Sequence, residues 1–237
     1  MEWFKYLFFG VILVGISMWV QINLFFGSLG REKSPITIVE NLQIQQLIKD
    51  KTGVDVGSIK ISESDRPFGM MIGIPGKPQL FLSRGLYDRF TPDEMEYVLL
   101  HETGHYVLRH TVSELFLGLG LLVAGVMMLR KVKKPIPALL VAGFLGLLFG
   151  IAMIRLGAFH ELRADNYSVT RMTNPEGMIN ATNKFRGYYG KSLTQTENKV
   201  IQWMFYRGNP YDNRIKMAEE YMCSVTNITL QECDIGN

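Results

Sequence analysis

Long uncharged stretches dominate the hydrophobic pattern of this chain. Residues 6–30 carry no charge over 25 positions, residues 115–129 none over 15, and residues 135–154 none over 20. About 20 apolar residues of helix cross a hydrocarbon core roughly 30 Å thick. A cleaved signal peptide is the alternative for residues 6–30, but the run exceeds a usual signal core and 27–30 is a poor cleavage site. The pattern therefore predicts three membrane spans, the first an uncleaved anchor.

The second and third runs form a predicted helical hairpin over residues 113–156. They are separated by four cations and a helix-breaking proline, in the sequence Arg130-Lys131-Val132-Lys133-Lys134-Pro135. This turn is expected to lie at the far membrane interface. Small residues let membrane helices approach closely. The glycines of the two arms are therefore expected to face each other: Gly118, Gly120 and Gly125 on one arm, Gly143, Gly146 and Gly150 on the other.

The remaining chain is polar and mixed, as in a soluble domain. Four segments follow from this pattern: an N-terminal anchor (1–30), the first half of a catalytic domain (31–112), the hairpin (113–156) and the second half of the domain (157–237). We expect an α+β fold that is mainly helical, with a small sheet. Residues 69–83 predict a β-hairpin around Pro75-Gly76, and Pro78 favours an edge strand there. An edge strand can pair with an extended peptide, although a purely structural hairpin fits the pattern equally well.

Composition and charge exclude several classes of protein. The chain of 237 residues is 47% hydrophobic and 20% charged, which is too apolar for a disordered chain. A net charge of +3 gives no strongly basic field, so no nucleic-acid partner is expected. Two cysteines are too few for a disulfide-stapled scaffold. No sequence feature indicates an oligomeric state.

The candidate catalytic residues follow a group of residues that is typical of the start of a helix. Thr91-Pro92-Asp93-Glu94 combines an N-cap, a proline at the first helical position and a capping-box glutamate. The predicted helix carries His101-Glu102-Thr103-Gly104-His105, in which two imidazoles lie one turn apart on one face. Such a pair can ligate one zinc ion, and Glu102 is then placed to take a proton from a water on the metal. Gly104 suits a close approach at this site.

A carboxylate is the natural third ligand. The metzincin pattern is excluded because Leu108 and Thr111 replace its glycine and histidine. On a continuous helix His110 lies off the metal face, so we interpret it as an interfacial residue or as a residue that supports a metal ligand, not as a ligand itself. Between His105 and residue 170 the acids are Glu114, Glu161 and Asp165.

Glu161 and Asp165 are four residues apart and share a helix face. The hairpin returns them to the side of the membrane where the histidines lie. Glu161 is the predicted ligand, with Asp165 accepting a hydrogen bond from a ligand histidine. A solvated face with Arg163 and ligation by Cys223 and Cys233 are the alternatives.

This pattern resembles the HtpX-type and CAAX-prenyl-protease-type family of membrane zinc metallopeptidases. The shared features are His-Glu-x-x-His, a hydrophobic hairpin and Glu161-Leu162-Arg163-Ala164-Asp165. The resemblance implies a zincin-like domain and one Zn²⁺ per chain. The segment Asn209–Ile215 is similar to a downstream element of the family, with Asn209 in place of its histidine. By this resemblance Arg214 is a catalytic residue near the metal.

Membrane sidedness follows from the predicted spans. One span before the zinc helix, where family members typically have two, puts the catalytic domain outside the cell membrane and the basic turn inside. A disulfide between Cys223 and Cys233 and two glycosylation sequons, at Asn180 and Asn227, agree with this orientation. Arg31 and Lys33 favour the alternative, a cytoplasmic catalytic domain.

The predicted function is a membrane-embedded zinc endopeptidase. Its partners are the lipid bilayer and a polypeptide substrate, a membrane or membrane-proximal protein in quality control or processing. The alternative is a non-proteolytic adaptor or assembly factor with a structural zinc ion. Glu102 argues against the alternative, since a structural site has no use for a base. A prenyl-peptide specialist would have many more spans.

Overall fold

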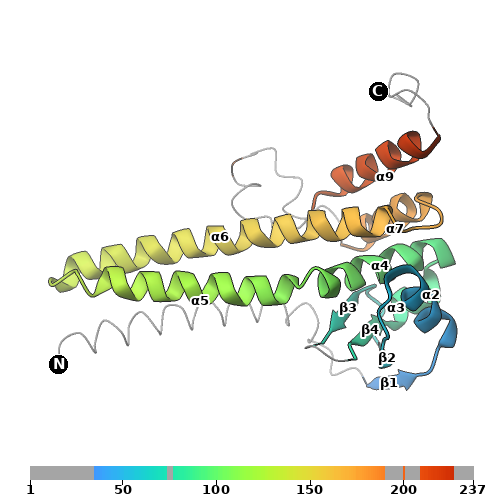
Figure 1. The fold of residues 1–237 in the computed structure, drawn as a ribbon, viewed down its shortest axis with the longest axis horizontal. Helices are drawn as coiled ribbons and strands as arrows, with labels where there is room; N and C mark the ends of the chain where they lie inside the picture. The colour runs from blue at the N-terminus through green and yellow to red at the C-terminus, as the bar shows by residue number, and fades with distance from the viewer. Residues whose placement is uncertain (1–34, 74–76, 190–199, 201–208, 227–237) are drawn as a thin grey trace.

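The fold was established from a computed structural model that describes residues 35–73, 77–189, 200 and 209–226. The N-terminal run of the predicted anchor therefore lies outside the described residues. The elements are β1 (Ile36–Val39), α2 (Leu42–Thr52), β2 (Ser58–Ser62), β3 (Gly69–Ile72), β4 (Gln79–Ser83), α3 (Arg84–Arg89), α4 (Pro92–Val107), α5 (His110–Leu129), α6 (Pro135–Val169), α7 (Glu176–Tyr189) and α9 (Tyr211–Thr226) (Figure 1). The described chain is mainly helical with one small sheet, as predicted.

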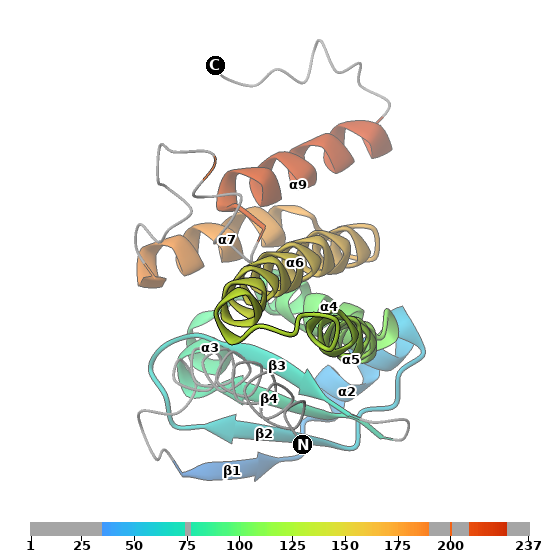
Figure 2. The ribbon, with the colours of Figure 1, turned by 90° about the vertical axis from the view of Figure 1, so that its left-hand side faces the viewer.

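The helices and the sheet are stacked in layers (Figure 2). The sheet lies on one side, α4 and α6 lie in the middle, and α7 and α9 lie on the other side. Helix α4 packs against β3 of the sheet and against α6 and α7 above it. The central residues of the core, which include Leu80, Leu99, Leu100 and Met178, are almost completely buried. Burial of these apolar side chains from three layers fixes α4 in the middle of the domain.

The sheet is mixed, with strand order β1-β2-β4-β3. Strand β2 runs parallel to β4, while β1 and β3 are antiparallel to their neighbours. The predicted β3–β4 pair is confirmed. The expectation drawn from Pro78 was wrong, because this residue lies just before β4, which is central. A proline outside the strand removes no ladder hydrogen bond. Of the two strands in this pair, β3 is the one at an edge of the sheet.

Helix α4 begins as its sequence predicts. The Thr91 side chain accepts a hydrogen bond from the backbone N–H of Glu94, and the Glu94 carboxylate accepts one from the backbone N–H of Thr91. This capping box satisfies backbone donors that the first turn leaves without partners. Helix α4 ends at Val107 and does not continue through residue 110. Arg109 adopts a left-handed conformation with φ 54°, and α5 begins at His110.

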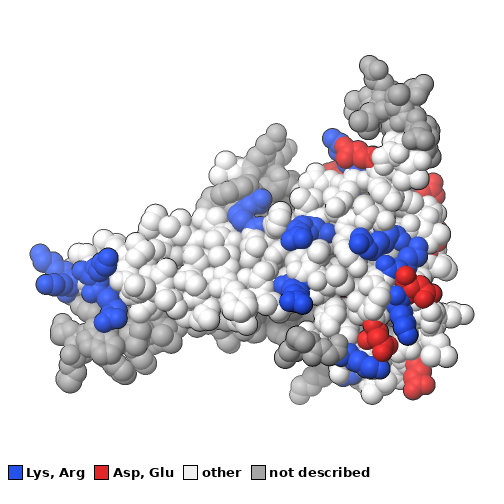
Figure 3. All heavy atoms as spheres, in the orientation of Figure 1, with Lys and Arg blue, Asp and Glu red and all other residues white. Residues whose placement is uncertain are grey.

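Helices α5 and α6 form the predicted hairpin and run side by side (Figure 1). Both are long and apolar enough to cross a membrane. Figure 3 shows an uncharged column between the mixed charges of the domain and a basic cluster at the far end of the hairpin. The cluster consists of Arg130, Lys131, Lys133 and Lys134, which are all exposed. Helix α6 is continuous past residue 156, the predicted end of the hairpin.

The expectation about the hairpin glycines was wrong. A methyl group added at Gly120, Gly125, Gly143, Gly146 or Gly150 meets nothing within 4 Å among the described residues, and one at Gly118 meets only Phe149 at 3.9 Å. These glycines therefore do not form the close contact between the two arms.

The close approach expected at Gly104 does occur. A Cβ atom there would lie 3.1 Å from the Tyr167 ring and 3.4 Å from the Cα atom of Ala164. Ala164 is itself completely buried. These two small residues bring α4 and α6 together at the level of the predicted ligands.

We predict that Gly104→Val forces α4 and α6 apart. An overpacked contact of this kind costs about 1–3 kcal/mol of stability, and the displaced histidines should lower the zinc content of the purified protein. Gly187→Val, at an exposed position on α7 where an added Cβ meets nothing within 4 Å, is the matched control. Thermal melting and metal analysis of both variants test this, and equal values for the two would contradict it.

Candidate functional site

Three of the predicted site residues meet between α4 and α6. His101 and His105 of α4 and Glu161 of α6 each offer one ligand atom, and these atoms lie within 4.8 Å of one another. The two Nε2 atoms are 3.1 Å apart. Each also lies 3.4 Å from a different carboxylate oxygen of Glu161. The four-residue spacing places both rings on one helical face, and the close contact of α4 with α6 brings the carboxylate to them.

Asp165 lies directly behind His101. Its Oδ1 atom is 2.8 Å from Nδ1 of His101, the ring nitrogen that faces away from Glu161. Oδ1 also accepts a hydrogen bond from the Tyr97 hydroxyl at 2.8 Å. The carboxylate is completely buried. Burial of a charge is costly unless it is paired and hydrogen-bonded, so these contacts hold Asp165 in place.

The remaining Asp165 contacts come from residues near the start of α9. Oδ2 accepts hydrogen bonds from Arg214 Nε and Asn209 Nδ2, both at 2.9 Å. Arg214 Nη2 also donates to Glu161 Oε2 at 3.0 Å. Arg214 therefore lies at the site, as the family resemblance implies. Asn209, where the family has histidine, contacts the carboxylate of Asp165.

Glu102 lies beside the three candidate ligands and close to the edge strand β3. A Cβ atom added at Gly69 would come within 3.4 Å of its Cγ atom. Burial raises the pKa of Glu102 to about 7 in the metal-free site, against the lowering effect of His101 and a hydrogen bond from the Met71 backbone. A carboxylate with a pKa near neutrality is suited to accept and return a proton.

The two histidines have opposite charge preferences in the metal-free site. Burial lowers the pKa of His101, but the charges and hydrogen bonds of Asp165 and Glu161 outweigh this and raise it to about 10. Burial and the charged His101 lower the pKa of His105 to about 4. A metal ion that binds here has to displace the proton of His101, because a ligating imidazole is neutral.

One close neighbour of the site agrees with the sequence prediction. Nδ1 of His110 lies 2.8 Å from Nδ1 of His105, and His110 is not one of the candidate ligands. The prediction assumed a continuous helix, however, whereas the left-handed Arg109 turns the chain before α5 begins. Glycine is the usual sequence signal for such a conformation, and none is present here. Tyr97, by contrast, could have been found from its position four residues before His101 on the same face.

Other predicted groups lie elsewhere or outside the described residues. Glu114 lies 3.3 Å from His160, away from the candidate ligands. Cys223 is buried on α9, and Cys233 lies in 227–237, so their disulfide stays a prediction. The Asn180 sequon is on α7.

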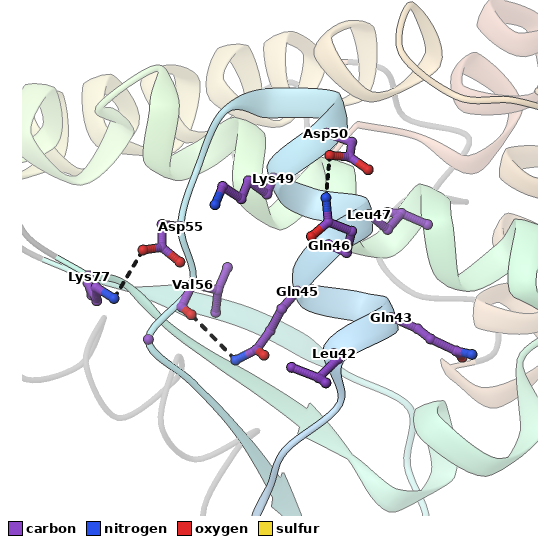
Figure 4. Close-up of a pocket in the computed structure, with 11 residues that line it drawn as sticks. Leu42, Gln43, Gln45, Gln46, Leu47, Lys49, Asp50, Asp55, Val56 and Lys77 are labelled. Atoms are coloured by element: carbon purple, nitrogen blue, oxygen red, sulfur yellow. Dashed lines mark hydrogen bonds and ion pairs between the residues drawn. The ribbon is translucent and has the colours of Figure 1, made fainter.

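An open pocket occurs next to α2 (Figure 4). Eleven residues line it, including Gln45, Gln46, Asp55 and Lys77. Its polar groups already pair with near neighbours: Lys77 with Asp55 at 3.0 Å, and Gln46 with Asp50 at 2.6 Å. The candidate ligands do not line this pocket, and it offers no group of convergent polar atoms to a ligand.

The donor set fits zinc. Two imidazoles and one carboxylate are a common set for catalytic zinc, which keeps a fourth position open. Behind the His101 ring lies a carboxylate, as is usual for zinc-ligating histidines. Together with a hairpin of membrane-spanning length, this site defines the class of the protein as a membrane metallopeptidase.

The comparisons with known proteins agree with this class. The sequence model of peptidase family M48 matches residues 43–222, so the chain belongs to peptidase family M48. The crystal structure of Ste24p from S. mikatae has the same fold, with a TM-score of 0.61 and 15% sequence identity. The alignment covers 91% of this chain and 57% of that one, so the chain spans just over half the length of Ste24p. The search of curated proteins finds no match.

These findings confirm the resemblance to HtpX-type and CAAX-protease-type membrane zinc metallopeptidases. Family M48 is a family of peptidases, and its metallopeptidases in general depend on zinc. The roles of the individual residues in this chain are proposals, which are argued next.

Proposed function

We propose that the protein is a membrane-embedded zinc endopeptidase whose active site lies between α4 and α6. The observation that carries this proposal is the convergence of His101, His105 and Glu161 within 4.8 Å, with Glu102 beside them. The alternative, an adaptor with a structural zinc ion, does not account for a partly buried glutamate with a raised pKa beside the three candidate ligands.

His101, His105 and Glu161 would hold the Zn²⁺ ion. When bound, zinc supplies Lewis acidity, which polarises the scissile carbonyl group and makes water acidic enough to ionise near neutral pH. Glu102 accepts the proton of the attacking water and then donates it to the leaving amine.

Asp165 and Arg214 orient this set. Asp165 holds the His101 ring through Nδ1, so that Nε2 faces the metal. Arg214 donates to both Glu161 and Asp165 and so holds the two carboxylates of α6 in fixed positions. We also propose that Arg214 stabilises the negative charge that develops on the carbonyl oxygen of the substrate.

The substrate is an extended peptide that pairs with the outer edge of β3, beside which no other strand lies in the described part of the chain. This strand is the edge of the sheet on the side of α4, and its Met71 backbone is hydrogen-bonded to Glu102. A peptide added along such an edge would place its carbonyl groups beside the general base.

The site lies close to the membrane, which favours membrane or membrane-proximal substrates. Glu161 is six residues after Arg155, the first charge that follows the apolar part of α6. Six residues of helix span about 9 Å. A cleavage site so near the bilayer would reach the segments of a membrane protein that adjoin its spans.

We also retain the proposed topology of three spans with an extracytoplasmic active site and a basic turn on the cytoplasmic side. The exposed cations at the far end of the hairpin support the orientation.

Glu102→Gln should abolish proteolysis while leaving metal binding intact. The amide keeps the size of the side chain but cannot accept the proton, so the rate should fall by about 10²–10⁴-fold. Glu176→Gln, which removes an exposed charge on α7, is the matched control. Peptide hydrolysis and zinc content are measured on both variants. Wild-type activity in Glu102→Gln would exclude the proposed mechanism.

The topology is tested by labelling single cysteines in intact cells, in chains whose Cys223 and Cys233 are replaced by serine. Lys216→Cys on α9 should react with a membrane-impermeant maleimide, because this side chain is 73% exposed and belongs to the catalytic domain. Lys133→Cys in the hairpin turn should react only after the membrane is permeabilised. The reverse pattern would place the active site in the cytoplasm.

A further inference from the structure

His110 reaches the site through an unusual backbone conformation. Arg109 is the only described non-glycine residue with a positive φ. A non-glycine residue in the left-handed region carries strain, and such strain is often found at functional sites. Its consequence here is that α5 starts in a new direction and His110, its first residue, faces back toward α4.

The side chain of His110 is buried and has one hydrogen-bond partner among the described residues. Its exposed fraction is 2%, and Nδ1 lies 2.8 Å from Nδ1 of His105. Its other ring nitrogen, Nε2, is buried without a hydrogen bond in the part of the chain that the structure describes. Burial of an imidazole with half of its polar groups unpaired is unfavourable, so the contact with His105 is the feature that accounts for its position.

A second histidine fixes the plane of the His110 ring. The rings of His110 and His160 stack with centroids 4.1 Å apart and planes at 6°. His160 is held by the Ser113 hydroxyl at 3.0 Å and by Glu114 at 3.3 Å. The stacked ring restricts rotation of His110 and keeps its Nδ1 atom directed at His105.

We propose that His110 is a positioning residue for the metal ligand His105. His105 donates its Nδ1–H to Nδ1 of His110, which fixes the tautomer in which the His105 Nε2 lone pair faces the metal. A zinc-ligating histidine normally donates its second ring N–H to a carboxylate or carbonyl group. His101 has Asp165 in this role, and His105 has His110.

The geometry distinguishes this role from direct ligation. His110 contacts the Nδ1 atom of His105, whereas the Nε2 atom of His105 faces His101 and Glu161. His110 is accordingly not a member of the group of potential ligands. The inference rests on the metal site of the proposed function and adds a residue that supports one of its ligands.

Three variants of the full-length protein in detergent test the proposal by zinc affinity. His110→Phe keeps an aromatic ring for the stack but removes the acceptor. His110→Asn restores an acceptor, because the amide oxygen lies near the position of Nδ1. Tyr221→Phe on α9 is the control, since it also keeps an aromatic ring and removes a polar atom, and its hydroxyl contacts Thr170 rather than the site. Competition with a chelator measures the zinc Kd of each variant.

We expect the zinc Kd to rise by about 10–100-fold in His110→Phe and to stay within about threefold of wild type in His110→Asn and Tyr221→Phe. A His110→Phe variant with wild-type affinity, or a His110→Asn variant as weak as His110→Phe, would overturn the proposal. A wild-type protein that binds no zinc would overturn the metal site itself and this inference with it. Tight wild-type binding without an effect at residue 110 would overturn the inference alone.

A second measurement keeps the test valid if His110→Phe does not fold. With ¹⁵N-labelled histidine the wild-type chain gives four imidazole spin systems, and long-range ¹H–¹⁵N correlations report which ring nitrogen carries the proton. In the zinc-loaded protein we expect a proton on Nδ1 of His105 and none on Nδ1 of His110. A proton on Nδ1 of His110, or its absence from Nδ1 of His105, contradicts the proposal.

Discussion

The buried carboxylate of Asp165 is the constraint on which the arrangement of the site depends. Its two oxygens contact four groups from two other parts of the chain: Tyr97 and His101 of α4, and Asn209 and Arg214 near the start of α9. Removing a carboxylate from water costs several kcal/mol, and this cost is offset only while the partners stay in place. Asp165 therefore fixes α4, α6 and α9 relative to one another, and with them the ring of His101.

The same helix joins this site to the membrane segment. Helix α6 runs without interruption from the basic turn, through its apolar part, to Glu161 and Asp165. The preceding arm, α5, begins at the residue that contacts His105. Both arms of the hairpin thus reach the candidate site. In the proposed arrangement the hairpin has two functions: it embeds the chain in the bilayer, and it brings Glu161, the proposed third ligand, to the histidines of α4.

Local signals accounted for much of this structure from the sequence. The capping box at Thr91 predicted the start of α4, the spacing of His101 and His105 predicted their shared face, and the uncharged runs predicted the hairpin that brings Glu161 back to them. Each of these features depends on residues within a few turns of one helix, or on the number of residues needed to cross a bilayer.

The features that the sequence did not predict depend on long-range packing or on unusual backbone conformations. The sequence predicted an interfacial or ligand-supporting place for His110, but the left-handed Arg109 that turns it toward His105 has no glycine to signal it. The hairpin glycines were expected between the two arms, but the rotation of each helix about its axis depends on contacts that apolar composition does not specify. The hydrogen bond from Asn209 to Asp165 depends on how α9 packs against α6, and the two residues are 44 positions apart in the chain.

Zinc K-edge X-ray absorption on the purified, metal-loaded protein tests the central claim most directly. Two imidazole ligands with a carboxylate and a further oxygen should give a first shell of nitrogen and oxygen at about 2.0–2.2 Å, with the multiple scattering of two histidine rings. Glu161→Ala should lose one oxygen from this shell while both histidines remain. A sulfur shell at about 2.3 Å would contradict the assignment. So would histidine scattering that stays unchanged when His101 or His105 is replaced.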